Sequence, residues 1–434
     1  MVYNNSTLKL TGIHTFMEKS ARQNGCGGVI DSTLNLTGNS IFMDNSAIEG
    51  GGINAFNSNL DFIGNKTFTN NLAKRGGGIH AINCILCFIG NSTFGNNSAA
   101  VNGAGVKIFS STLNSFGNTG FINNSAVFGG GISVFDSTLN ITGNTAFRKN
   151  KAEYYGGSIY AWKTTLNLVT YRVDSNSKYA DCSSHTLLFM NNSAKFLGGA
   201  VYTSDSNLTF EGCNTFSGNS AWYYGGGVHS QNSTLKFSGN TIFSSNFVQY
   251  NGGGIHGVGT TLYFSGIGSF TANTAGRGGA EYLANSFILL SRNSTVIMNN
   301  NSATEYGGAV YVEDSNPITY CTSEELVLER CFFETYEVLE IPNTESSNFT
   351  QAVIAYYNIH IHFYNNHAEI AGNAVYGGLV DICRIRVDYK STNGIGFHFL
   401  IMNDVLNIEL EANQLSLHLS TPNKLLINFF QMPS

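Results

Sequence analysis

The sequence predicts an all-β fold, a single-stranded right-handed parallel β-helix in which each coil of roughly 26 residues holds about three short strands. Two motifs recur in phase along most of the chain, and the residues between them alternate with period two. Gly, Asn, Ser and Thr take the place of most charged residues. A fixed period of about 20 to 50 residues is typical of solenoids, propellers and repeat arrays.

The first motif is a Gly-Gly pair that leads into an apolar residue. This apolar residue recurs at Ile30, Ile53, Ile79, Val106, Ile132, Ile159, Val201, Val228, Ile255, Val310 and Val380. A weaker copy ends at Glu281. The second motif is Phe-x-x-Asn-x-Ala, whose first residue is Phe42, Phe68, Phe94, Phe121, Phe147, Phe189, Phe216 or Phe270. No stretch has helical periodicity, which excludes ankyrin, tetratricopeptide and leucine-rich repeats, and the unit is shorter than a propeller blade of about 40 residues.

Stacking of coils converts each motif into a column, because equivalent residues of neighbouring coils lie about 4.8 Å apart. We expect three columns to face inward and close a triangular core: the Phe residues, the apolar residues after Gly-Gly, and a Leu column. The Leu column consists of Leu34, Leu60, Leu86, Leu113, Leu139, Leu166, Leu208, Leu235 and Leu262. Gly and Asn suit the corners, which require positive φ, and stacked Asn side chains also form hydrogen bonds along the column.

Breaks in the period suggest the organisation of the chain. We expect β-helix repeats over 1–315 with an inserted loop near 171–185, a Cys-containing acidic insertion over 316–352, a further coil over 353–380 and a cap-like segment over 381–434. Both insertions should project as loops from a corner. The first repeat is already in phase at Phe16 and no signal peptide precedes it, so we expect this chain to be part of a longer protein.

Composition excludes several classes of protein. Charged residues make up 12% of the chain, the net charge is -6, and 42% of residues are hydrophobic, so neither a disordered chain nor a nucleic-acid-binding protein is expected. Pro occurs only 4 times, which excludes collagen. No apolar run reaches the roughly 18 residues of a transmembrane helix.

The paired Gly-Gly-x-Ile and Phe-x-x-Asn motifs resemble the repeats of the polymorphic outer-membrane proteins, which are bacterial surface adhesins. The resemblance covers roughly 1–315 and returns over 362–380. It implies a right-handed β-helix with an adhesive role. A similarly built secreted or surface protein of a eukaryote is equally compatible with the motifs.

Cysteine and sequon usage bear on the compartment. Eight Cys are too few for a disulfide-built scaffold. Cys321 with Cys331 is the preferred disulfide pair, and Cys182 with Cys213 is the second. Cys84 and Cys87 should face opposite sides of one strand. Glycosylation candidates, which favour an extracellular or cell-surface location, are Asn35, Asn91, Asn123, Asn191, Asn232, Asn293 and Asn348.

A catalytic site is not predicted. The Asp residues Asp31, Asp136, Asp205 and Asp314 precede a strand at a coil corner, where Asp commonly serves the turn. The residues that follow the apolar position should form an outward, solvent-facing column that includes His80, Ser133, Tyr160, Tyr202, His229, His256, Tyr282 and Tyr311. No matching column of Cys, Asp or Glu accompanies its His residues, so we expect neither a metal site nor a cofactor.

Aromatic residues before the Gly pair form the candidate ligand-binding ridge: Tyr154, Tyr155, Trp222, Tyr223, Tyr224 and Tyr250. Ring stacking for stability is one interpretation, and recognition of a glycan or a cell-surface protein is the other. We therefore predict a monomeric, non-catalytic adhesion, recognition or scaffold protein. The alternative is a polysaccharide-active β-helix enzyme of the lyase or hydrolase type.

Overall fold

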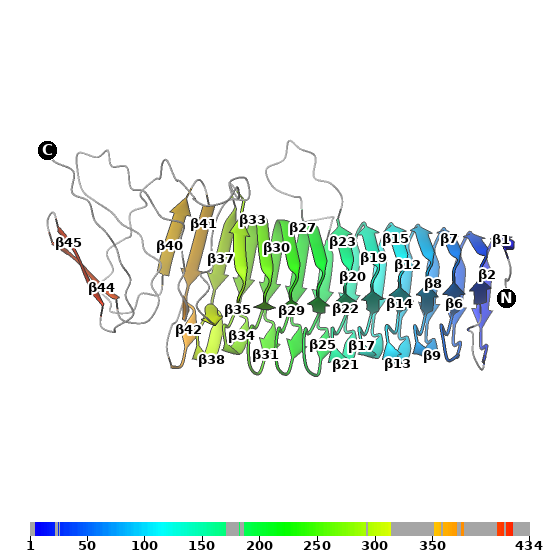
Figure 1. The fold of residues 1–434 in the computed structure, drawn as a ribbon, viewed down its shortest axis with the longest axis horizontal. Coiled ribbons are helices and arrows are strands. Elements are labelled where there is room, and N and C mark those ends of the chain that lie inside the picture. Colours follow the sequence, from blue (N-terminus) through cyan, green and yellow to red (C-terminus); the bar gives the residue numbers. More distant parts are fainter. Residues whose placement is uncertain are drawn as a thin grey trace.

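The structure is a computed structural model that describes residues 5–21, 25, 27–170, 182, 186–291, 294–313, 351–356, 359–370, 375–376, 406–411 and 414–419. Figure 1 shows an elongated solenoid whose coils stack side by side from the N-terminal end towards β41 (Ile359–Tyr364). Apart from two antiparallel pairings, the paired strands run parallel, and no described segment is helical. The predicted parallel β-solenoid is therefore confirmed.

Three sheets run the length of the solenoid. The first, a 21-stranded sheet, receives two strand segments from most coils, separated by a bend. Its strands are β1 (Thr7–Thr11), β2 (His14–Met17), β4 (Thr33–Thr37), β5 (Ser40–Met43), β7 (Asn59–Ile63), β8 (Lys66–Thr69), β11 (Ile85–Ile89), β12 (Ser92–Gly95), β15 (Thr112–Phe116), β16 (Thr119–Ile122), β19 (Thr138–Thr142), β20 (Thr145–Arg148), β23 (Thr165–Val169), β24 (Leu187–Met190), β27 (Asn207–Ser217), β30 (Thr234–Ser244), β33 (Thr261–Thr271), β36 (Phe287–Leu290), β37 (Thr295–Asn299), β40 (Gln351–Tyr356) and β41.

The second sheet has 12 strands: β3 (Gly27–Ile30), β6 (Ile53–Phe56), β10 (Ile79–Ile82), β14 (Val106–Phe109), β18 (Ile132–Phe135), β22 (Ile159–Trp162), β26 (Val201–Ser204), β29 (Val228–Gln231), β32 (Ile255–Val258), β35 (Glu281–Ala284), β39 (Val310–Glu313) and β43 (Val375–Tyr376). The third has 10: β9 (Leu72–Arg75), β13 (Ser98–Asn102), β17 (Ser125–Phe128), β21 (Lys151–Tyr155), β25 (Ser193–Ala194), β28 (Ser220–Ala221), β31 (Phe247–Val248), β34 (Thr274–Arg277), β38 (Ser302–Tyr306) and β42 (His367–Ala368). A separate hairpin pairs β44 (Leu406–Glu411) with β45 (Gln414–Leu419).

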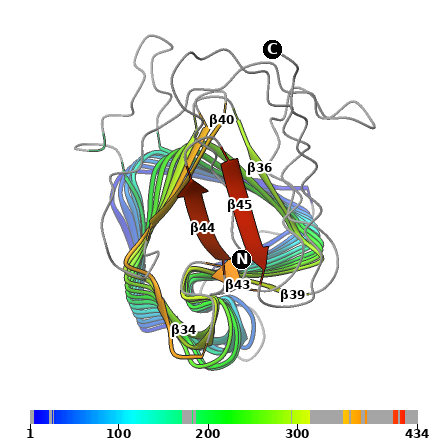
Figure 2. The same ribbon diagram turned by 90° about the vertical axis from the view of Figure 1, so that its left-hand side faces the viewer.

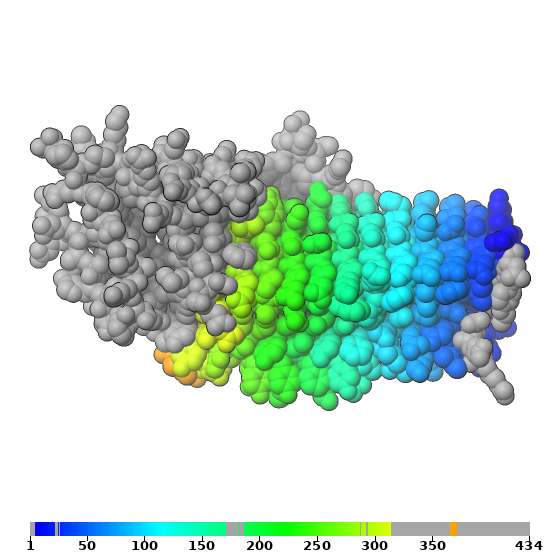
Figure 3. All heavy atoms as spheres, viewed as in Figure 1, coloured from blue at the N-terminus to red at the C-terminus, as the bar shows by residue number. Residues whose placement is uncertain are grey.

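Figure 2, which looks along the solenoid, shows the sheets around a core, with the third sheet and its turns curled into a lobe near β34. We call this part, from the third-sheet strands to the following Gly pair, the lobe. Figure 3 shows the coils as one continuous stack, in which the colour changes steadily from the N-terminal end. Each surface position of one coil therefore has a counterpart in the next coil, whatever residue occupies it.

The predicted inward columns are confirmed. All nine Leu residues of the Leu column and the Phe residues of the second motif are buried, as are the apolar residues after Gly-Gly from Ile53 to Val310. Neighbouring Phe rings stack closely: the centroids of Phe42 and Phe68 are 4.6 Å apart, and those of Phe121 and Phe147 are 5.0 Å apart. Ile30 was assigned to the wrong column, because Gly27 pairs with Ile53 and Ile30 pairs with Phe56.

A column of buried Asn side chains ties each coil to the next. Asn124 represents it: its Nδ2 donates to Asn150 Oδ1 at 3.0 Å and to the carbonyl oxygen of Phe94 at 2.9 Å. Its Oδ1 accepts from the backbone N–H and the Nδ2 of Asn97. The full column is Asn45, Asn71, Asn97, Asn124, Asn150, Asn192, Asn219, Asn246, Asn273, Asn301 and Asn366. The residue before most members has positive φ, as at Asn70 and Asn123. In each Asn pair the first residue therefore forms the corner and the second forms the hydrogen bonds between coils, as predicted.

Two charged side chains, Lys66 and Glu281, are buried in the interior of the solenoid. Lys66 replaces a Ser of the neighbouring coils, and its Nζ donates to the carbonyl oxygens of Gly38, Ile63 and Gly64 at 2.6, 2.8 and 3.1 Å. Glu281 lies between Ile255 and Val310 in the inward column. It is fully buried, and neither carboxyl oxygen has a hydrogen-bond partner among the described residues. Burial raises the pKa of Glu281 to about 8.

Cysteine positions agree with the second of the two pairings. Cys182 and Cys213 form a disulfide with Cα atoms 5.5 Å apart, which attaches one end of the 171–185 insertion to β27. Cys321 and Cys331 lie outside the described residues, as do nearly all of the 316–352 insertion and most of both the 171–185 loop and the 381–434 segment. Cys84 is buried and Cys87 is half-exposed, so they face opposite sides as predicted.

Replacing Asn124 with Ala should destabilise the solenoid by about 2 to 4 kcal/mol, because it leaves buried groups of Phe94, Asn97 and Asn150 without their partner. Urea denaturation measures this change. Thr93→Ala, at an exposed position on β12, is the control and should lie within about 0.5 kcal/mol of wild type. Equal effects of the two variants would contradict a structural role for the Asn column.

Replacing Glu281 with Val, the residue type of its neighbour Val310, should stabilise the protein increasingly as pH rises. The carboxyl stays neutral in the folded state up to about pH 8 but ionises near pH 4.5 once exposed. The stability that wild type holds below pH 4.5 is therefore lost between these values, at about 1.4 kcal/mol per pH unit. Thermal melts from pH 4.5 to 8.5 test this, with Glu281→Gln as the uncharged control. If the difference in melting temperature between Glu281→Val and wild type is the same at every pH, the raised pKa of Glu281 is refuted.

Candidate functional site

The residues that follow the inward apolar position form one column on the outer face of the second sheet. Paired backbones place its members in order as Asn54, His80, Lys107, Ser133, Tyr160, Tyr202, His229, His256, Tyr282 and Tyr311. We call this set the second-sheet column. The expectation that it faces solvent is wrong, since His80, His229, His256 and Tyr282 are each at most 4% exposed.

Six rings of this column stack face to face. From Tyr160 to Tyr311, successive centroid distances are 5.1, 5.3, 4.8, 4.7 and 5.0 Å, and no pair of planes deviates by more than 19°. The coil repeat sets this spacing, because each ring belongs to the same position of successive coils. A stack of this kind supplies packing area along the sheet and leaves the ring faces covered.

The lobe explains why the column is buried. Residues directly before the Gly pair form bridges along the lobe at Tyr155, Leu197, Tyr224, Asn251 and Arg277. The ring of Tyr155 stacks on Tyr202 at 5.0 Å, and that of Tyr224 stacks on His256 at 4.6 Å. The lobe therefore folds back over the second sheet, as the curl in Figure 2 shows. Sequence periodicity gives the outward direction of a side chain, but it cannot show that another sheet covers it.

Burial keeps the histidines of this column neutral. It lowers the pKa of His229 to about 3, and together with His229 it lowers the pKa of His256 well below the usual value. The Nδ1 atoms of both have no hydrogen-bond partner among the described residues. No group of three His, Cys, Asp or Glu side chains comes together as a metal site in the described part of the chain.

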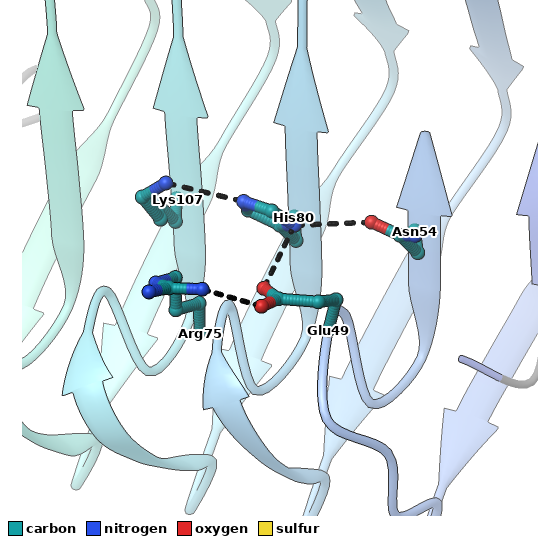
Figure 4. A network of polar contacts seen from close by, with 5 residues as sticks. All are labelled: Glu49, Asn54, Arg75, His80 and Lys107. Carbon is teal, nitrogen blue, oxygen red and sulfur yellow. Dashed lines mark hydrogen bonds and ion pairs between the residues drawn. The ribbon is translucent and has the colours of Figure 1, made fainter. Parts of the chain in front are cut away.

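The N-terminal end of the column is polar (Figure 4). His80 Nδ1 lies 3.0 Å from Asn54 Oδ1 and 3.2 Å from Glu49 Oε2, while His80 Nε2 lies 3.1 Å from Lys107 Nζ. Arg75 Nη1 donates to Glu49 Oε1 at 2.6 Å. Glu49 and Arg75 come from the lobe, at the bridge position that Tyr155 and Tyr224 take in later coils. The column therefore changes from charged to aromatic along the solenoid.

The six residues of the predicted ridge separate into two groups. Tyr155 and Tyr224 are half-buried and cover the second-sheet column, as described above. Tyr154, Trp222, Tyr223 and Tyr250 are exposed, by 36% to 54%. The rings of Phe196, Tyr223 and Tyr250 stack along the lobe at 5.5 and 5.2 Å, and Tyr154 packs against Phe196 at 5.2 Å. We call Tyr154, Trp222, Tyr223 and Tyr250, together with the half-buried Phe196, the exposed ridge.

A second outward apolar column, whose side chains are exposed or half-exposed, does not appear among the sequence-based predictions. It lies on the outer face of the second sheet, two residues beyond the second-sheet column, and consists of Ile30, Phe56, Ile82, Phe109, Phe135 and Trp162. We call it the apolar strip. The signal was present, because the third residue after the inward apolar position is large and apolar in five successive repeats from Phe56 to Trp162.

Ring contacts connect the exposed ridge to the apolar strip. Tyr154 contacts Phe128, and Phe128 contacts Tyr160, in both cases with centroids 5.5 Å apart. Phe135 then lies 5.2 Å from Tyr160 and 6.1 Å from Trp162. Ring contacts therefore run without a break from Tyr250 to Trp162. We call these rings, together with Trp222 and the rest of the strip, the aromatic surface. Contiguous exposed apolar surface of this kind is typical of interaction sites.

The structure also shows the positions of the predicted corner Asp residues and glycosylation sites. Asp31, Asp136 and Asp205 occupy corners with positive φ, which supports the turn interpretation, and Asp314 lies outside the described residues. Of the sequon residues, Asn91, Asn123, Asn191 and Asn232 are exposed and Asn35 is half-exposed. Asn293 and Asn348 lie outside the described residues. No helix long and apolar enough to cross a membrane occurs in the part of the chain that the structure describes.

The fold and the regular columns define a parallel β-solenoid repeat protein. Comparison with protein families adds a more specific relationship: the model of the Chlamydia polymorphic membrane protein repeat matches residues 295–313. That segment runs from β37 to β39 and holds Asn301, Ala303, Gly307 and Val310 of both motifs. The solenoid therefore contains a repeat of the polymorphic membrane protein type. No curated protein and no solved structure matches the chain.

Buried neutral histidines should make the protein sensitive to acid. A His that is kept neutral by burial contributes stability above pH 6.5, and this is lost as pH falls towards its folded pKa, at about 1.4 kcal/mol per pH unit. His256→Phe, which preserves a ring between His229 and Tyr282, should reduce the fall in melting temperature between pH 6.5 and 4.5. If the melting temperature of His256→Phe falls with pH as much as that of wild type, protonation of His256 does not destabilise the folded state and the prediction is wrong.

Proposed function

We propose that this protein is a non-catalytic recognition protein of a cell surface or of the extracellular space, and that it binds its partner through the aromatic surface. The observation that carries this proposal is the series of ring contacts from Tyr250 through Tyr154 to Trp162, in which exposed and half-buried rings follow one another across several coils. Aromatic anchors on a rigid scaffold lose little conformational entropy on binding.

The arrangement of the rings favours a protein partner over a sugar at the centre of the exposed ridge. Tyr223 stacks between Phe196 and Tyr250, with interplanar angles of 2° and 10°, so both of its faces are occupied. Sugar rings pack on aromatic faces, whereas protein surfaces also pack against ring edges and hydroxyl groups. Trp222, the most exposed ring at 54%, is the residue that suits a glycan best.

Two further observations support a surface location. The matching repeat is described as one of a membrane protein family, and four exposed sequons lie at positions where an attached glycan would point away from the core. We infer that the solenoid presents the aromatic surface outside the cell.

Replacing Trp222, Tyr223 and Tyr250 together with Ser should reduce binding to cells or to a glycan array by tenfold or more, because all three side chains are exposed to solvent. Tyr224 is left intact, since its ring covers His256 and its loss would disturb the fold. Phe116→Ser is the control, since Phe116 is 49% exposed on the first sheet, away from the aromatic surface. It should bind as wild type does.

Two outcomes would overturn the proposal. Binding by the triple Ser variant equal to wild type would assign the exposed ridge a purely structural role. Cleavage of an acidic polysaccharide by the purified chain, abolished by replacing one exposed carboxylate, would favour the β-helix enzyme instead.

A further inference from the structure

Two tyrosines of the exposed ridge lie next to each other on successive coils. Tyr223 and Tyr250 directly precede Tyr224 and Asn251, whose backbones form one of the bridges along the lobe. The ring centroids of Tyr223 and Tyr250 are 5.2 Å apart, and the ring planes differ by 10°. This separation is close to the coil repeat of about 4.8 Å, so the two phenol rings are stacked almost in register.

Both phenol rings are open to solvent. Tyr223 is 36% exposed and Tyr250 is 46% exposed. Tyr154 is the other exposed tyrosine of the described residues, and its ring packs on Phe196 rather than on either of these two. Tyr223 and Tyr250 are therefore the one pair of exposed tyrosines, among the residues that the structure describes, whose rings stack on each other. We call them the exposed tyrosine pair.

Tyrosine pairs of the second-sheet column are equally close but are shielded from solvent. The centroids of Tyr160 and Tyr202 are 5.1 Å apart, and those of Tyr282 and Tyr311 are 5.0 Å apart. Tyr202 is 8% exposed and Tyr282 is 3% exposed, and the Tyr282 hydroxyl donates to Glu313. These pairs are internal controls, because they have the spacing of the exposed tyrosine pair without its accessibility.

The third sheet is narrow where it carries the exposed tyrosine pair. β28 and β31, which precede the two tyrosines, contain two residues each, whereas β17 and β21 contain four and five. The pairing of β28 with β31 joins only Ser220 to Phe247 and Ala221 to Val248. A covalent bond between the two rings would therefore connect neighbouring coils where few backbone pairs connect them.

We propose that Tyr223 and Tyr250 form an oxidative cross-linking site, at which hydrogen peroxide and a haem peroxidase convert the stacked pair into a dityrosine. Each phenol gives up one electron and one proton, which leaves a tyrosyl radical on each ring. The two radicals couple through the carbons ortho to the oxygens. The hydrogen on each of these carbons then moves to the oxygen of its own ring, which restores both phenols. The two electrons and two protons reduce one hydrogen peroxide to two water molecules.

The geometry favours this coupling over reaction between two molecules. Tyr223 and Tyr250 are 27 residues apart in the sequence, and the solenoid stacks their rings before either is oxidised. Such positioning gives one radical a high effective concentration at the other. The exposed rings can turn about the Cβ–Cγ bond until the ortho carbons meet. Phe196, on the far face of Tyr223, has no hydroxyl group and forms no phenoxyl radical.

Peroxidase treatment of the dilute, folded chain tests the proposal. The full chain is incubated with a haem peroxidase and hydrogen peroxide, and cross-linked peptides are identified by mass spectrometry after digestion. We expect a peptide pair joined through Tyr223 and Tyr250, two hydrogens lighter than its parts, in a chain that still migrates as one molecule on a denaturing gel. This product should be at least about ten times more abundant than the cross-links within the two tyrosine pairs of the second-sheet column.

Conservative variants identify the residues that react. Tyr223→Phe and Tyr250→Phe each keep a ring in the stack, and each should abolish the cross-link, because a phenylalanine ring has no phenolic hydrogen to lose. Tyr154→Phe is the matched control, since it removes the third exposed tyrosine, and it should leave the yield unchanged. Treatment in urea should reduce the yield of wild type by about tenfold or more, because unfolding separates residues that are close only in the solenoid.

Three results would each overturn the proposal: a product no more abundant than the second-sheet cross-links, an equal yield in urea, or a cross-link that persists in either of the Tyr223→Phe and Tyr250→Phe variants. The experiment measures cross-links and not binding, so its failure does not bear on recognition by the aromatic surface. Loss of recognition while the cross-link still forms would count against the proposed function alone.

Discussion

Every part of this structure depends on one constraint, the stacking of each residue on its counterpart in the next coil. Parallel pairing places equivalent residues about 4.8 Å apart, so a column is favourable only if its residue type tolerates contact with itself. Leu, Phe and Ile satisfy this by packing, and Asn satisfies it with an amide that donates to one coil and accepts from the other. Repeated like charges would repel, which explains why charged residues are only 12% of the chain.

The same constraint explains the exceptions. Lys66 is accepted in the core because a corner presents three carbonyl oxygens to its Nζ. Glu281 has no such partner and stays protonated in an apolar column. On the second sheet, Lys107 follows His80, and a hydrogen bond to a neutral ring replaces what would be repulsion between like charges. In each case the polar groups within reach of the side chain determine whether it keeps its charge.

The sequence predicted the fold and its inward columns, because a period of 26 or 27 residues places Leu34 above Leu60 and Asn71 beside Asn97 without further information. It also predicted the positive-φ corners and the second of two disulfide pairings. Prediction failed at Ile30, where the first Gly-Gly copy is shifted against the next coil, and at the second-sheet column, which is covered by the lobe. It also missed the apolar strip from Phe56 to Trp162, although that strip repeats regularly.

The sequence by itself therefore determined which residues share a column, since this follows from chain periodicity and backbone pairing alone. The curl of the third sheet over the second decided which outward columns meet solvent. That curl packed Tyr224, which is half-buried, against His256 and left the adjacent Tyr223 exposed on the lobe. It also brought Glu49 and Arg75 to His80 and Lys107. These contacts join different sheets, and the spacing of residues along one strand does not specify how one sheet folds against another.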